Sequence, residues 1–148
     1  MLFAIAIALL ASCCMAKTSE PQAQCTLHRD GKAVAIADAD SLVQIVTRIL
    51  NSCDDSLLLI VSPDMIAEIK RSDVALEIVF PQSFAATSPD GSKRMINKVL
   101  LPFSGDYGSP ADLSYAVVFS GEKGYVTPAW SNSHAQTDLQ KLKTLLIY

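Results

Sequence analysis

Residues 74–80, VALEIVF, decide the fold of this chain. The stretch is rich in β-branched and large apolar residues, and successive residues of a strand face opposite sides of a sheet, so it predicts a strand. Pro81 ends it, and residues 84–87 extend it up to the turn sequence SPDGS at residues 88–92. Residues 94–101, RMINKVLL, then return as a second strand. This part of the sequence therefore predicts a β-hairpin.

More strands and a helix are expected after the hairpin. Residues 102–112, PFSGDYGSPAD, are rich in turn-forming residues and predict a long loop. Residues 113–119, LSYAVVF, predict a strand, and residues 125–127 predict a short strand that follows a turn. Residues 129–134 are expected to form a loop. Leucines spaced by three and four positions in residues 136–148 predict a C-terminal helix.

The segments before the hairpin predict two helices. Apolar residues recur at steps of three and four over residues 38–53, which is typical of an amphipathic helix. Residues 54–61, DDSLLLIV, fit either a buried strand or a helical turn. Ser62-Pro63-Asp64 then begins a second helix, with serine as the N-cap and proline at the first helical position. Residues 25–36 fit two short strands around a glycine-containing turn, although their alanines suit a helix equally well.

These elements predict a single α+β domain over residues 25–148. The expected architecture has two layers: an antiparallel sheet of about four strands, with two N-terminal helices and a C-terminal helix packed on it. The chain has 148 residues, of which 50% are hydrophobic, and this is enough to form one core.

The N-terminal segment indicates export. Residues 2–11 form an apolar run, which has the length of a signal core and falls short of the ~20 residues that span a bilayer. The sequence Leu10-Ala11-Ser12-Cys13 directly after it resembles the lipobox of bacterial lipoproteins. The resemblance implies that Cys13 is lipidated and becomes the new N-terminus. It also implies an outer-membrane lipoprotein that faces the periplasm, since no aspartate follows Cys13.

Other interpretations of this segment stay open. Small residues at Cys14 and Ala16 fit cleavage after Ala16, which would give a soluble periplasmic or secreted protein. No lysine or arginine precedes the apolar run, so a buried N-terminal helix of a cytosolic protein is a further alternative. Under either export reading, residues 17–24 (KTSEPQAQ) form a polar tether between the processed segment and the domain.

The cysteines and the charge of the chain limit the kinds of bond and ligand that we expect. Two of the four cysteines lie in the signal segment, which leaves Cys25 and Cys53 as a predicted disulfide, with two buried thiols as the alternative. The net charge of −3 and the scattered charges argue against a nucleic-acid binder. No metal-ligand spacing or glycine-rich phosphate loop is present, so we expect neither a metal nor a cofactor.

Aromatic residues in the loops form the candidate contact surface. Aromatic side chains in Gly/Ser/Asn-rich loops offer a large contact area at low entropic cost. The alternative is that Phe103, Tyr125 and Trp130 cap the hydrophobic core. The candidate contact residues are Phe103, Asp106, Tyr107, Trp130 and His134.

The sequence favours a protein without catalytic activity. We expect an exported, lipid-anchored envelope protein that acts by protein–protein contact, as an accessory, assembly or inhibitory factor. One alternative is a periplasmic module that binds a small ligand or a glycan through the aromatic loops. Another is a small hydrolase that uses His134 or His28 as its base, beside Ser104 or Asp106.

Overall fold

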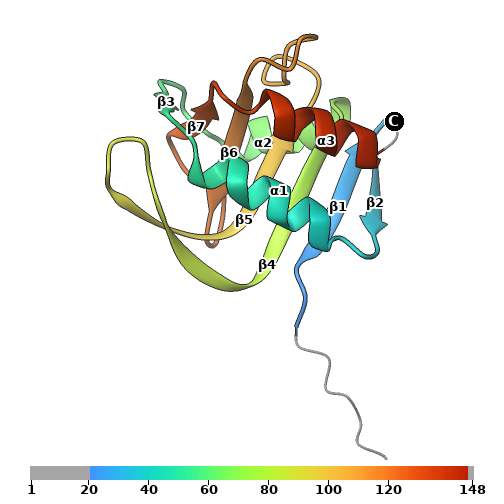
Figure 1. Cartoon of the computed structure of the whole chain (residues 1–148), viewed down its shortest axis with the longest axis horizontal. Coiled ribbons are helices and arrows are strands. Elements are labelled where there is room, and N and C mark those ends of the chain that lie inside the picture. Colours follow the sequence, from blue (N-terminus) through green and yellow to red (C-terminus); the bar gives the residue numbers. More distant parts are fainter. Residues whose placement is uncertain (1–20, 147–148) are drawn as a thin grey trace, which may run out of the picture.

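The computed structural model describes residues 21–146, which form one seven-stranded antiparallel sheet and three helices (Figure 1). The strands are β1 (Gln24–Arg29), β2 (Lys32–Ile36), β3 (Asp55–Leu57), β4 (Ala75–Thr87), β5 (Lys93–Pro102), β6 (Ala116–Gly121) and β7 (Ala129–Asn132). The helices are α1 (Asp40–Asn51), α2 (Pro63–Ser72) and α3 (Gln136–Leu146). The strand order is β2-β1-β4-β5-β6-β7-β3. The predictions for Cys13, Ala16 and residues 17–20 lie outside the described residues.

The predicted architecture is wrong in two respects. The sheet has seven strands and not about four, because the β1–β2 hairpin joins β4 at one end and the short strands β7 and β3 extend the other end. The helices also cover both faces, so the domain has three layers and not two: α1 and α3 lie on one face and α2 on the other (Figure 1). The short strand expected at residues 125–127 is absent, and β7 occupies part of the expected loop.

The predicted hairpin forms, and it supplies the two central strands. Leu76 of β4 lies opposite Leu101 of β5, and Ile78 lies opposite Val99. The register shifts between Val79 and Phe84, where Pro81 interrupts the pairing, and the hairpin continues to its turn at residues 88–92. Because every second residue faces the same side, β4 and β5 contribute apolar side chains to both faces of the sheet.

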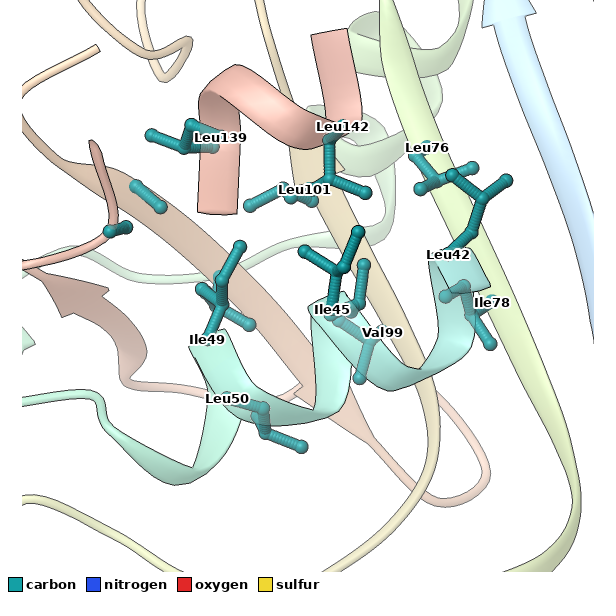
Figure 2. Close-up of a cluster of buried hydrophobic side chains, with 14 of the residues drawn as sticks. Leu42, Ile45, Ile49, Leu50, Leu76, Ile78, Val99, Leu101, Leu139 and Leu142 are labelled. Carbon is teal, nitrogen blue, oxygen red and sulfur yellow. The ribbon is translucent and has the colours of Figure 1, made fainter. Parts of the chain in front are cut away.

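The larger core lies between this sheet and the pair α1 and α3 (Figure 2). Helix α1 buries residues at steps of three and four, as the sequence pattern predicts, and these meet the leucines of α3 above the central strands. The side chains labelled at this contact are Leu42, Ile45, Ile49, Leu50, Leu76, Ile78, Val99, Leu101, Leu139 and Leu142.

The smaller core holds α2 against the opposite face. Ile66 and Ile69 of α2 are buried against Leu100, Val117 and Phe119 of the sheet. The start of α2 follows the prediction, because the Ser62 hydroxyl accepts a hydrogen bond from the Met65 N–H (3.2 Å) and a proline occupies the first turn.

The predicted Cys25–Cys53 disulfide is not present, since both residues are free thiols. Cys25 lies in β1, near enough to Asp40 at the start of α1 for that carboxylate to raise its pKa. The Cys53 thiol instead contacts the Ile49 carbonyl at the end of the helix (3.3 Å). In the sheet, Cys25 is flanked by Ile36 of β2 and Ile78 of β4.

We predict that both thiols react slowly in the folded protein. Burial, with a smaller contribution from Asp40, raises the pKa of Cys25 to about 11, and burial together with Asp54 raises that of Cys53 to about 12. At pH 8 the reactive thiolate is therefore rarer by roughly a hundredfold or more than in an ordinary thiol. Peptide mass spectrometry after timed alkylation should show slow labelling of both cysteines before unfolding and fast labelling afterwards. A disulfide-linked pair of these peptides would contradict the structure.

We predict that truncating a buried side chain of the larger core destabilises the protein far more than truncating an exposed one. Ile49→Ala removes a side chain that is 1% exposed, so the free energy of unfolding should fall by about 2–5 kcal/mol. Leu145→Ala, at an apolar position that is 51% exposed, is the matched control and should change it by less than about 0.5 kcal/mol. Urea unfolding of both variants measures the difference. Equal losses would show that α1 is not packed as described.

Candidate functional site

The loop between β5 and β6 is fixed at its beginning and displays Asp106 and Tyr107. The Phe103 N–H donates to the Val74 carbonyl (2.7 Å), and the Val74 N–H donates to the Ser104 hydroxyl (2.8 Å). Gly105 has a positive φ of 75°, and a Cβ there would lie 2.3 Å from the Asp73 carboxylate oxygens. The positive φ favours glycine here, and any other residue would also have to displace the Asp73 side chain.

Tyr107 lies between two hollows on the α2 side of the sheet and lines both of them. Its half-buried ring packs edge-on against Phe119, with ring centroids 5.7 Å apart, so the side chain has a fixed position. The first hollow, the Tyr107 groove, has a volume of about 360 Å³ and is lined by Leu57, Leu58, Leu59, Asp106, Tyr107, Tyr115, Val117 and Ser131. The second, the acidic hollow, has a volume of about 380 Å³ and is lined by Met65, Glu68, Ile69, Ser72, Asp73, Gly105, Asp106 and Tyr107.

The apolar residues after β3 are exposed beside the Tyr107 groove. Leu58 and Ile60 are 106% and 81% exposed, whereas Leu59 and Val61 between and after them turn toward the smaller core. The Val61 N–H donates to the Thr127 hydroxyl (2.9 Å), which fixes the end of this segment. The sequence prediction of a buried strand or a helical turn over residues 54–61 is therefore wrong. The strand ends at Leu57, and because β3 is the edge of the sheet, half of the run remains exposed.

The acidic hollow carries excess negative charge. Burial raises the pKa of Asp73, and repulsion by Asp106 and then by Glu68 raises it further. Glu68 is already paired with Arg71 on the same helix. Within residues 21–146, neither Asp73 nor Asp106 forms an ion pair. This side of Tyr107 therefore attracts cationic groups.

A second polar cluster lies in the sheet face beneath α2, around Glu77 of β4. Its Oε1 accepts hydrogen bonds from Lys70 Nζ and from the Tyr125 hydroxyl, both at 2.5 Å, and its Oε2 lies 2.9 Å from His28 Nε2. Burial opposes ionisation of this carboxyl. The hydrogen bonds from Lys70, Tyr125 and His28 outweigh that effect and hold the pKa of Glu77 below its ordinary value. Burial and the Glu77 carboxylate both raise the pKa of Tyr125, so its hydroxyl stays protonated and remains a donor.

The structure separates the predicted contact residues. Phe103 and Trp130 are 8% and 0% exposed and lie in the larger core. For these two residues, the alternative prediction of a core position is therefore confirmed. The Trp130 ring lies beneath the Arg94 guanidinium at 4.5 Å. Asp106 is exposed and borders the groove with Tyr107. His134 is exposed elsewhere, 3.6 Å from Asp54.

The two predicted base histidines have other partners. His28 is bound to Glu77 and His134 neighbours Asp54, while the Ser104 hydroxyl is engaged with the Val74 N–H. Among the hydrogen bonds and ion pairs of the described residues, none joins either histidine to Ser104 or Asp106.

The described residues contain no group of three or more His, Cys, Asp and Glu side chains placed to hold a metal ion. None of the three helices in this part of the chain is both long enough and apolar enough to cross a membrane. Comparisons of the chain with known protein families, with curated proteins and with solved structures found no match in any of the three. Its function must therefore be inferred from its own residues.

We predict that Glu77→Gln lowers stability in a pH-dependent way. At pH 7 the free energy of unfolding should fall by about 2–3 kcal/mol, because the cation of Lys70 loses its buried counter-charge. The folded-state pKa of Glu77 lies below the ordinary value of 4.5, so its contribution is complete above that pH and is lost as the pH falls through the folded pKa. Urea unfolding at several pH values should show the two proteins converging only in acid. A difference that grows toward acid would contradict this assignment.

Proposed function

We propose that this chain is an exported, lipid-anchored envelope protein that acts without catalysis, by binding another protein through the Tyr107 groove. The proposal for the address comes from the apolar run and from the likeness of Leu10-Ala11-Ser12-Cys13 to a lipobox. The proposal for the contact comes from the surface around Tyr107 and from the segment after β3.

The observation that carries the contact proposal is the exposure of Leu58 and Ile60 beside the groove. Leu58 lines the groove and Ile60 follows it by two residues, and exposed apolar side chains that cluster mark interaction sites on soluble proteins. Burying each of them in a complex would be favourable by roughly 1.5–3 kcal/mol. Tyr115, which is 41% exposed, lines the same groove and adds an aromatic side chain to the surface.

The chemistry of the surface defines the partner. The Tyr107 groove selects apolar side chains, and the uncompensated carboxylates of Asp73 and Asp106 on its other side select cations. Strand β3 is the last strand of the sheet, so its outer edge is open to a further extended chain. The partner is therefore an extended protein segment that carries both apolar and basic residues.

A pair of defined peptides tests this specificity. An extended peptide of alternating lysine and valine should bind the protein saturably in fluorescence anisotropy, and the same peptide with glutamate in place of lysine should not. Leu58→Ser combined with Ile60→Ser should abolish binding, whereas Asp106→Lys should reverse the preference between the two peptides. Val34→Ser is the control, since Val34 is 55% exposed on the opposite edge strand.

Some results would remove the contact proposal. Equal binding of the two peptides would mean that the carboxylates do not select the partner. Loss of binding in the Val34 variant, or full binding in the Leu58 and Ile60 double variant, would place the contact elsewhere. Melting temperatures of all variants should stay near that of the parent protein, because each substituted side chain is exposed.

The lipid anchor has its own test. Intact mass of the protein purified from the membrane fraction should show an acyl adduct on Cys13, and Cys13→Ala should move the protein to the soluble fraction. A soluble product that begins at Lys17 would show that the protein is secreted and has no lipid anchor. An unprocessed chain would contradict export itself.

A further inference from the structure

A separate apolar pocket lies between α2 and the turn that follows β6. It has a volume of about 310 Å³ and is lined by Pro63, Ile66, Ala67, Lys70, Gly124 and Tyr125. None of these residues lines the Tyr107 groove or the acidic hollow. The volume falls at the lower end of the range of about 300–1,000 Å³ that is typical of small-molecule sites.

The chain is folded tightly to form one wall of this pocket. Gly121 ends β6, and a Cβ at this position would lie 1.7 Å from the Gly124 carbonyl oxygen. A side chain at Gly121 would therefore displace the turn, which is closed by a hydrogen bond from the Val126 N–H to the Ser120 carbonyl (3.0 Å). The tight turn brings Gly124 and Tyr125 up against α2.

Lys70 is the one charged residue in the lining, and it is held in place. Its ammonium group lies 2.5 Å from Glu77 Oε1 and 5.5 Å from the centre of the Tyr125 ring. A lysine ammonium has three N–H bonds, and Glu77 is the sole hydrogen-bond acceptor that the described residues offer to it. Donor capacity therefore remains at the charged end of an otherwise apolar pocket.

We propose that this pocket binds a small apolar carboxylate. The carboxylate would accept hydrogen bonds from Lys70, and the apolar body would pack on Ile66, Ala67 and the Tyr125 ring. Glu77 positions Lys70 for this role without itself lining the pocket. The inference is independent of protein contact at the Tyr107 groove, because the two sites share no residue.

The test uses two probes that differ in the sign of the charged group, hexanoate and hexylammonium. Amide NMR signals of the full chain should shift saturably with hexanoate at Ala67, Lys70 and Gly124, and hexylammonium should give no saturable shifts there. Equal binding of the two probes, or no saturable shift with either, would overturn the proposal. Shifts confined to Leu58 and Tyr115 would also overturn it, since they would place the carboxylate in the Tyr107 groove.

Two variants and their controls locate the site. Ala67→Trp should fill the pocket and abolish hexanoate binding, whereas Glu68→Trp, on the same helix but outside the pocket lining, should not. Lys70→Gln should weaken binding roughly tenfold, and Arg71→Gln, the neighbouring cation outside the lining, should leave it unchanged. Binding that persists in Ala67→Trp would overturn the proposal. If Lys70→Gln lowers the melting temperature, hexanoate binding by Ala67→Trp and Glu68→Trp still tests the pocket. Ala67 is exposed and takes no part in the Glu77 network.

Discussion

A half-buried carboxylate in a central strand needs hydrogen-bond donors to stay ionised, and Glu77 takes its donors from three other parts of the chain. Strand β1 supplies His28, helix α2 supplies Lys70, and the segment before β7 supplies Tyr125. Apolar burial is non-directional and would tolerate many positions of α2 on the sheet. Hydrogen bonds to one carboxylate at 2.5 to 2.9 Å tolerate fewer, so the Glu77 network adds a directional contact to the apolar packing of α2.

Both proposed sites lie on the sheet face that α2 covers, and each depends on the placement of that helix. One side of α2, with Ile66 and Lys70, forms the apolar pocket with the turn after β6. The end of α2 meets the β5–β6 loop at Asp73 and Gly105, which presents Tyr107 between the groove and the acidic hollow. The opposite face, packed with α1 and α3, has the larger apolar core. The α2 face thus carries both proposed sites, and the face of α1 and α3 carries the larger core.

Local patterns in the sequence were sufficient for the central hairpin and for the three helices, because strand alternation, helical spacing and the Ser62-Pro63 start are properties of neighbouring residues. They could not show that β3 lies at the sheet edge, that α2 packs on the face opposite α1, or that Cys25 and Cys53 are not bonded to each other. Those facts depend on pairing between distant segments. Loop composition predicts Asp106 and Tyr107, whereas an unbroken apolar run predicts burial and gives no sign that Leu58 and Ile60 are exposed. Lys70 and Tyr125 carry no local signal of their shared contact with Glu77.

The most direct test of this account is a pH titration of the Glu77 side-chain carboxyl carbon followed by NMR in the folded protein. The network of three donors predicts a midpoint below the ordinary glutamate value of 4.5. Such a midpoint would establish that Glu77 is an ionised carboxylate paired with donors from β1, α2 and the Tyr125 segment. A midpoint at or above 4.5 would show that burial outweighs the hydrogen bonds, and would contradict the pairing of an ionised Glu77 with Lys70 beside the apolar pocket.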